Sequence, residues 1–389
     1  MPVTGLQDVT VAYGDGTVAL RRVTLQAADG ELLVVLGPSG SGKSTLLRVV
    51  AGLTAVQSGE VLIGGRQVTK LPVQRRDVAM VFETTSLLPF LDVAENLAWG
   101  LRARHVPDAE VRQRVSAQAR GLRLTRLLAR KPATLSSGEQ ALVGIGRAMV
   151  RVPAAFLLDE PLSHLDAVDR LRMRRRIAEL VREVGVTTLY VTHDQADALA
   201  IADRVAVLRE GTVVQVGAPL DLYRRPANLF VAGFVGTPPM GLLPARLVAS
   251  AGSAGFQVGA RTLPLWAPVP PQLRDSTGRH VVLGVRPEDV FDATEGCDPE
   301  FVALPATVLA IEHTGPEKVV TVAVAAPPVA APGADPADAR AGRARLRCRF
   351  PAKAEVRRGG VVQVAVDAAR AHVFDATTGQ ALWHPDSPA

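Results

Sequence analysis

The sequence is poor in cysteine and contains no long apolar run. Two cysteines, Cys297 and Cys348, occur among 389 residues, and their separation matches no metal-binding or redox motif. A disulfide framework is therefore not expected, and the low cysteine content fits a reducing compartment. No window approaches the roughly 18–20 apolar residues that a helix needs to cross a bilayer.

The start of the sequence also has no export signal. Residues 1–5 show no charged segment followed by an apolar one, which is the pattern of a secretory signal peptide. We therefore expect a cytosolic chain, in which any role at a membrane depends on a partner protein.

The charge balance excludes little by itself. Lys and Arg number 44 and Asp and Glu 38, which gives a net charge of +6. This surplus permits contact with acidic lipid or nucleic acid but implies neither. The arginine-rich segment 170–176 also carries apolar residues at Leu171 and Met173, with Ile177 directly after it. That pattern favours a solvated helix face over a nucleic-acid patch, so no nucleic-acid partner is expected.

The patterning predicts two regions of different class. Residues 1–235 alternate strand-like and helix-like segments, as in an α/β nucleotide-binding domain, and residues 84–150 form a helical insertion in it. Within the insertion, apolar residues recur at helical spacing over 93–101 and 111–128. The predicted strands of this region are 32–36, 78–82, 155–158, 188–192 and 204–208.

Residues 236–389 predict a small all-β domain. Short β-branched runs are separated there by Gly and Pro, at 281–285, 306–311, 318–324 and 361–366. Residues 325–343 are rich in Ala, Pro, Gly and Asp, which is typical of a mobile surface loop.

The strongest chemical motif is a glycine-rich loop that satisfies G-x-x-x-x-G-K-[ST]. It lies between a predicted strand and a predicted helix, so its backbone N–H groups and the helix N-terminus converge on one phosphate. Lys43 supplies a positive charge for the β and γ phosphates, and Ser44 a hydroxyl ligand for Mg²⁺. These residues predict a site for a nucleoside triphosphate. The loop and the residue after it are Gly37, Pro38, Ser39, Gly40, Ser41, Gly42, Lys43, Ser44 and Thr45.

Acidic and imidazole groups follow two further predicted strands. Asp159 and Glu160 end an apolar strand, where Asp159 is placed to hold Mg²⁺ and Glu160 to orient or deprotonate a water. His193 follows the strand at 188–192, at the end of a parallel sheet where ligands bind. We expect His193 near the γ-phosphate.

A short segment between these motifs resembles the signature of the ATP-binding cassette (ABC) ATPases. It reads Leu-Ser-Ser-Gly-Glu at 135–139, where that family usually has Leu-Ser-Gly-Gly-Gln. Residues 163–166 resemble the family's D-loop, Tyr13 its adenine-stacking aromatic, and His193 its switch histidine. The resemblance implies a P-loop NTPase fold, ATP and Mg²⁺ as ligands, and a helical insertion.

The resemblance continues into the second half of the chain. Residues 223–240, 284–289 and 311–315 are similar to the junction and the OB-like regulatory domain of importers for sugars and glycerol-3-phosphate. It implies an ATPase that energises solute import, bound to membrane permease subunits and served indirectly by an external solute-binding protein. Importers for polyamine, iron or sulfate, which carry related domains, remain an alternative.

The family resemblance also implies a dimer, with a homodimer expected. ATP held by one chain would be covered by the signature of the other. The residues that contact nucleotide from that side would be Ser136, Ser137, Gly138, Glu139 and Asp166. An enzyme of DNA repair or of the ribosome is a weaker reading, because the chain has one phosphate loop and no sustained heptads.

Three residues depart from the family pattern at functional positions. Glu83 stands where the family usually has a Gln that meets Mg²⁺ and senses the permease, and Ser137 and Glu139 alter the signature. A carboxylate about 6 Å from a phosphate costs on the order of 2–3 kcal/mol at an effective dielectric near 20. Mg²⁺ would offset this for Glu83, whereas Glu139 has no compensating group in the sequence. A slow or non-hydrolysing subunit paired with a competent cassette is therefore the alternative.

Overall fold

The computed structural model describes residues 3–83, 87–250, 253–265, 269–293, 301–329, 333 and 342–385. It divides into two compact units, Met1–Pro219 and Leu220–Ala389. The compositional change at residue 236 lies inside the second unit.

The first unit is built on a six-stranded sheet of order β10-β9-β3-β8-β7-β6. All of these strands are parallel except β10, which pairs antiparallel with β9. Every residue of β3, β7 and β8 is buried, which explains their nearly unbroken apolar sequences. The five strands predicted from sequence are confirmed. The observed bounds are β3 (Leu32–Leu36), β6 (Val78–Val81), β7 (Ala155–Asp159), β8 (Thr188–Thr192), β9 (Arg204–Arg209) and β10 (Thr212–Gly217).

A second, antiparallel sheet shares the same core. Its order is β2-β1-β4-β5, and one hydrophobic cluster joins Leu6 and Leu20 of this sheet to Leu46 of α1 (Lys43–Ala51) and Leu189 of β8. This packing brings β2 beside the first turn of α1. The strands are β1 (Val3–Ala12), β2 (Val18–Ala28), β4 (Ser58–Ile63) and β5 (Arg66–Gln67).

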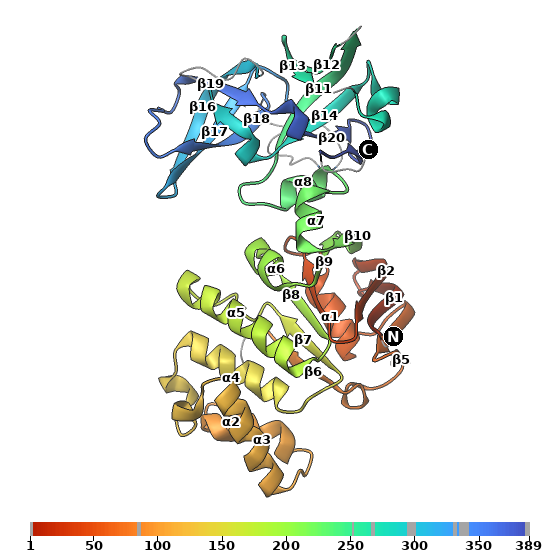
Figure 1. Ribbon diagram of the computed structural model, residues 1–389. Helices are drawn as coiled ribbons and strands as arrows, with labels where there is room; N and C mark the ends of the chain where they lie inside the picture. The colour runs from red at the N-terminus through yellow and green to blue at the C-terminus, as the bar shows by residue number, and fades with distance from the viewer. Residues whose placement is uncertain are drawn as a thin grey trace. The chain divides into compact units, whose positions relative to one another are not determined.

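The helical insertion forms a separate layer of the first unit. Helices α2 (Val93–Arg102), α3 (Asp108–Gly121) and α4 (Ser137–Met149) lie together in Figure 1. The prediction of a helix through residue 128 was wrong at its end, because α3 stops at Gly121 and Arg123 adopts a left-handed φ of 57°. Residues 84–86 of the insertion lie outside the described residues.

Two more helices follow β7 and β8. They are α5 (Ala167–Val184) and α6 (Gln195–Ile201). On α5, Met173 and Ile177 are buried as expected, but Leu171 is 48% exposed. Arg170 and Arg174 are partly buried against carboxylates of the α6 N-terminal region rather than fully solvated.

The second unit is largely antiparallel β-structure around one core, which confirms the predicted all-β class. Two sheets, ordered β13-β12-β11-β14-β20-β21 and β15-β19-β16-β17-β18, share buried side chains such as Phe256, Leu283, Val320 and Phe350. The helices α7 (Pro219–Arg224) and α8 (Leu229–Phe234) precede them. The strands are β11 (Gly241–Ser250), β12 (Ser253–Val258), β13 (Arg261–Leu265), β14 (His280–Val285), β15 (Val290–Asp292), β16 (Ala303–His313), β17 (Glu317–Val324), β18 (Arg345–Pro351), β19 (Val361–Val366), β20 (His372–Asp375) and β21 (Ala381–Trp383).

Much of the low-complexity segment 325–343 lies outside the described residues, at 330–332 and 334–341. At its start, Ala326 and Val329 are buried. The described part of this segment is therefore not a purely exposed loop. Cys297 also lies outside the described residues, and Cys348 is buried.

Candidate functional site

The phosphate-binding loop, residues 37–44, connects β3 to α1 and depends on glycine at two close contacts. A Cβ at Gly37 would lie 2.3 Å from the carbonyl oxygen of Leu208, and one at Gly42 would lie 2.4 Å from that of Ala19. Gly42 also has a left-handed φ of 102°. Only glycine fits these positions without moving the backbone, so the loop is held tightly between β9 and β2.

Lys43 is buried at the base of the loop. Its side chain is 5% exposed, and Nζ donates to the carbonyl oxygen of Pro38 at 3.0 Å. Nζ also lies 3.9 Å from Oε1 of Glu160. Burial lowers the pKa of Lys43, and the charges of Glu160 and Asp159 act in the opposite direction. The result is a desolvated cation directed at the place where the sequence predicts phosphate.

Ser44 and Asp159 form a second polar contact beside Lys43. The Ser44 hydroxyl donates to Oδ1 of Asp159 at 2.9 Å, and Asp159 is 5% exposed at the end of β7. Burial raises the pKa of Asp159, and the hydrogen bond from Ser44 offsets part of that effect. Hydroxyl and carboxylate oxygens are the ligands that Mg²⁺ prefers, usually together with substrate phosphates and water. Within the described residues, no group of three or more His, Cys, Asp and Glu forms an all-protein metal cage.

Glu160 and His193 are hydrogen-bonded to each other. Nδ1 of His193 lies 2.7 Å from Oε2 of Glu160; because an ionised carboxylate only accepts, Nδ1–H is the donor. Glu160 has a left-handed φ of 44°, a strained conformation for a residue with a side chain. Its backbone N–H donates to Val191 of β8 at 3.0 Å. Because a strained conformation persists only where its surroundings impose it, these two hydrogen bonds hold the carboxylate in a fixed place between two strand ends.

These groups open into one cavity of about 680 Å³, here named the P-loop pocket. Most of the residues predicted to bind nucleotide within the same chain line this pocket. They are Tyr13, Ser39, Gly40, Gly42, Lys43, Ser44, Thr45, Glu83, Glu160 and His193. Gly37, Pro38 and Ser41 belong to the loop itself, and Ser41 Oγ is buried without a hydrogen-bond partner among the described residues.

The sequence interpretation missed part of the pocket wall. Thr17, Val18, Ala19, Arg21, Glu210 and Gly211 also line it. They come from Thr17 and the strand β2 that follows it, and from the β9–β10 turn; β2 and this turn meet where Arg21 N donates to the Gly211 carbonyl at 2.8 Å. No local motif marks these residues, because only the packing of the two sheets brings them to the pocket.

Tyr13 lies at the open side of the same pocket. Its hydroxyl and that of Thr45 are 2.8 Å apart, and its side chain is 42% exposed. An exposed aromatic ring beside a phosphate loop can stack on a planar base, which fits the role expected for adenine.

The signature residues lie elsewhere in the first unit. Ser136, Gly138 and Glu139 line a second cavity of about 590 Å³, here named the signature pocket, between α4, α5 and the segment 122–127 that follows α3. Ser137 is the first residue of α4, and Asp166 caps α5 by accepting from the backbone N–H groups of Val168 and Asp169, each at 2.9 Å. The structure of one chain thus separates the predicted nucleotide residues into two sites.

Glu139 has a compensating group, contrary to the expectation from sequence. Its Oε2 accepts from the backbone N–H of Ser136 at 2.8 Å, while the Ser136 hydroxyl accepts from the Glu139 N–H at 3.3 Å. This capping box places the carboxylate at the positive end of α4. The negative charge is therefore partly neutralised.

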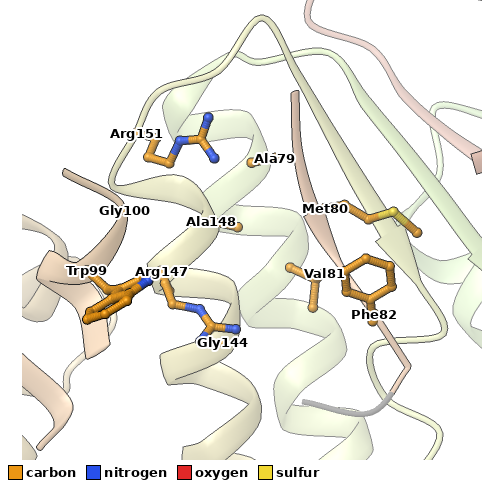
Figure 2. Close-up of a pocket in the computed structure, with 10 residues that line it drawn as sticks. All are labelled: Ala79, Met80, Val81, Phe82, Trp99, Gly100, Gly144, Arg147, Ala148 and Arg151. Carbon is orange, nitrogen blue, oxygen red and sulfur yellow. The ribbon is translucent and has the colours of Figure 1, made fainter. Parts of the chain in front are cut away.

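A third concavity lies between β6 and the helical insertion. This groove, of about 190 Å³, is lined by Phe82, Trp99, Arg147 and Arg151 among others. Figure 2 shows Trp99 and Phe82 on opposite sides, with Arg147 of α4 between them. Phe82 is 45% and Trp99 49% exposed. Glu83, next to Phe82, lines the P-loop pocket, so a single short segment borders both places.

Family models of known proteins match each of the two units separately. Residues 20–163 match the family model described as ABC transporter, and residues 236–290 match the MalK OB fold domain. The chain is 44% identical over 387 residues to an sn-glycerol-3-phosphate import ATP-binding protein of Cereibacter sphaeroides, covering 98% of this chain and 100% of the relative. The chain belongs to the ABC transporter family.

Other relatives agree over the full length. A trehalose/maltose import ATP-binding protein of Thermococcus litoralis is 41% identical, and the alignment covers 97% of this chain and 99% of the relative. A trehalose import ATP-binding protein of Mycobacterium tuberculosis is 41% identical and covers 98% of both. As a member of this family, the chain is a nucleotide-binding subunit that hydrolyses ATP.

Solved structures of ABC proteins share the fold. One is the dimeric ATP-binding cassette MJ0796 bound to ADP and Pi, with a TM-score of 0.50, 30% identity and coverage of 56% of this chain and 98% of that one. Another is cbiO1 from Clostridium perfringens, part of the transporter complex cbiONQ, with a TM-score of 0.53, 26% identity and coverage of 57% and 89%. In the described part of this ABC chain, no helix has the length and apolar character of a membrane span.

Proposed function

We propose that this chain is the ATPase subunit of an importer for a carbohydrate or a related polyol phosphate. It works on the cytoplasmic face of the membrane, bound to permease subunits that receive solute from an external binding protein. The full-length similarity to import ATP-binding proteins for glycerol-3-phosphate, trehalose and maltose supports this substrate class over polyamine, iron or sulfate. The observation that carries the mechanism is the convergence of Lys43, the Ser44–Asp159 contact and the Glu160–His193 pair on one pocket.

The phosphate-binding loop and its neighbours hold the triphosphate. Loop N–H groups and Lys43 bind the β and γ phosphates, and Tyr13 stacks on the base. Ser44, Asp159 and Glu83 would hold Mg²⁺, and the bound ion would supply positive charge to neutralise the phosphates. The short Ser44–Asp159 distance and the buried carboxylate support this assignment.

Glu160 acts on the attacking water. Its carboxylate orients the water and accepts its proton, and the hydrogen bonds to Val191 and from His193 keep it in place. Because Nδ1 of His193 donates to Glu160, Nε2 remains available to contact the γ-phosphate.

The signature pocket completes the site of a second copy. Ser136, Gly138 and Glu139 line the signature pocket, Ser137 begins the same helix, and the signature pocket shares no lining residue with the P-loop pocket. One chain therefore does not bring both sets of residues to one nucleotide. We assign the signature residues, with Asp166, to the ATP bound by the partner in a homodimer. ATP favours the closed dimer and hydrolysis the open one, which is a shift between two populations.

The groove of Figure 2 is the surface we assign to the permease. Two exposed aromatic side chains, Phe82 and Trp99, flank it, and Arg147 and Arg151 add positive charge. Its neighbour Glu83 faces the P-loop pocket. A permease segment seated there is thus one residue away from the nucleotide site, which couples the two.

The test is steady-state ATP hydrolysis by the full chain and by its Glu160→Gln variant. Glu183→Gln, an exposed position on α5, serves as the matched control. We expect turnover to fall by about 10²–10⁴ in Glu160→Gln with ATP binding retained, and to persist in Glu183→Gln. Turnover that survives in Glu160→Gln would exclude this mechanism.

A further inference from the structure

Arg170, in the first turn of α5, contacts two segments that flank the hydrolytic pair. Nη1 donates to Oδ2 of Asp194 at 3.0 Å. Nη2 donates to the carbonyl oxygens of Leu165 at 3.1 Å and Ser163 at 3.4 Å. One guanidinium therefore joins the segment that follows β7 to the segment that follows β8.

Each of these segments is attached directly to a residue of the Glu160–His193 pair. The backbone N–H of Ser163 donates to the Glu160 carbonyl at 3.2 Å, and Asp194 is the residue after His193. Asp194 is fixed at its other oxygen as well, because Oδ1 caps α6 by accepting from Ala196 N at 2.8 Å. A movement of Arg170 would thus be transmitted to both members of the pair.

The groups enclose one small space behind the pair. Glu160, Ser163, Arg170, His193 and Asp194 line a cavity of only about 10 Å³. The Arg170 and Asp194 side chains are 29% and 23% exposed. In this setting the ion pair is partly shielded from water, and it keeps more of its strength than one at the surface.

We propose that Arg170 is a positioning residue for ATP hydrolysis. Its planar fork sets the separation between the end of β8, which carries His193, and the segment that starts at Glu160. The hydrogen bond between the two then persists while the dimer opens and closes. This inference rests on the proposed hydrolytic role of Glu160.

Two other arginines of α5 have a purely structural role and provide the comparison for Arg170. Arg174, one helical turn along α5, binds Oδ1 of Asp197 at 2.7 Å, and Asp197 also accepts from the buried Tyr190 hydroxyl. That pair fastens α5 to α6 deeper in the fold. Arg182, near the end of α5, is 57% exposed and donates to the Ile201 carbonyl at 3.3 Å. It links the same two helices far from the pocket, so it is the matched control.

The experiment compares four full-length variants: Arg170→Met, Asp194→Asn, their combination, and Arg182→Met. Asn retains the helix cap at residue 194 but loses the charge. We expect kcat for ATP to fall about tenfold in Arg170→Met, with KM within about twofold, because only the geometry of the reacting pair changes. The double variant should lose no more than Arg170→Met, since the two groups act as a unit. Arg182→Met should keep kcat within about twofold at a similar melting temperature.

Two outcomes would overturn the inference while leaving the proposed function intact. One is an unchanged kcat in Arg170→Met beside a Glu160-dependent wild type. The other is a loss in Arg170→Met that Arg182→Met matches at equal melting temperature.

If the wild type shows no Glu160-dependent turnover, the proposed function fails. The effect of Arg170 on the position of His193 is then tested by a second measurement. The ¹⁵N resonances of the His193 ring, assigned by their loss in His193→Gln, should move in Arg170→Met and stay in Arg182→Met. Unmoved His193 resonances in Arg170→Met would refute the positioning role.

Discussion

Both units of this ABC ATPase bury ionisable side chains, but they surround them differently. In the first unit, Lys43 and Asp159 are each 5% exposed; Lys43 lines a cavity of about 680 Å³, and Asp159 accepts from Ser44, which lines the same cavity. In the second, Arg286 and His372 are 3% and 4% exposed and are enclosed by backbone, aromatic and imidazole groups. Charge buried beside a pocket is available to a ligand. An ionisable group buried inside a closed network serves the architecture.

Arg286 illustrates the closed kind. Nη1 donates to the carbonyl of Val235 at 2.7 Å, and Nη2 donates to that of Tyr223. The guanidinium also lies 3.8 Å from the centre of the Tyr223 ring, and the Tyr223 hydroxyl donates to Glu288. Burial lowers the pKa of Arg286 and, with the bond to Glu288, raises that of Tyr223 to about 12. These contacts fasten the segment between α7 and β11 to the β-sheet unit.

The largest expected difference between the units follows from removing Arg286. In Arg286→Met, two carbonyls lose their donor, which costs roughly 2–3 kcal/mol and lowers the melting temperature of the second unit by about 5–10 °C. ATP turnover should stay within about twofold, because the P-loop pocket is built entirely from the first unit. Calorimetry and an ATPase assay measure the two effects. Arg274→Met, at an exposed position of the same unit, is the control. A turnover loss without a stability loss would contradict the comparison.

A smaller effect is expected from acid. Nδ1 of His372 lies 2.9 Å from Nδ1 of His384, so one ring donates and the other accepts. Burial, followed by the charge of Arg286 and then by His384, lowers the pKa of His372 from 6.5 to about 3. Between these values the unfolded chain binds the proton and the folded chain does not, so stability falls as pH drops below 6.5.

The acid effect is measured as the melting temperature of the second unit between pH 7 and pH 5. We expect the free energy of unfolding to fall with pH below 6.5, at a rate that approaches about 1.4 kcal/mol per pH unit. His372→Gln should flatten this dependence, while His280→Gln, at an exposed position, should leave it unchanged. A wild-type melting temperature that does not change between pH 7 and pH 5 would show that burial does not keep His372 neutral.

The smallest expected effect concerns the altered signature. Because Glu139 accepts from Ser136 N at the start of α4, its charge is already partly compensated. Replacing it with Gln, which can keep the same hydrogen bond, should raise turnover only about two- to fivefold. The helix end (about 0.3–1 kcal/mol) and the hydrogen bond to the charged carboxylate (about 1.5–3 kcal/mol) already offset most of the repulsion between Glu139 and phosphate. A tenfold or greater rise would revive the alternative of a subunit with a degenerate site.

The sequence was informative wherever a motif and its structural context coincide. The phosphate-binding loop, the Asp159–Glu160 pair and His193 each follow an apolar strand, and parallel strands end on one edge of a sheet, so their convergence was predictable. The compensation of Glu139 was also within reach, since Ser136 and Glu139 match the S-x-x-E pattern of a capping box. The same residues also resemble the family signature, and that resemblance gives no indication of a cap.

Other features depend on packing over long sequence separations. Arg170 belongs to a run that resembles a solvated helix face, and its partner Asp194 is 24 residues away. Nothing near either residue indicates that α5 and α6 bring them together. Arg21 and Glu210 reach the P-loop pocket for the same reason, through the meeting of β2 with the β9–β10 turn.

The central claim is that the P-loop pocket of one copy and the signature pocket of another form a single ATP site. Ser39 and Ser137 are exposed and lie at separate places in one chain. The most direct measurement mixes two full-length chains, one with Ser39→Cys and one with Ser137→Cys. Both carry Glu160→Gln and have Cys297 and Cys348 replaced by Ala. We predict a disulfide-linked dimer that forms in the mixture when ATP is added and not with either chain alone. ATP binding without any cross-link in the mixture would contradict the shared site.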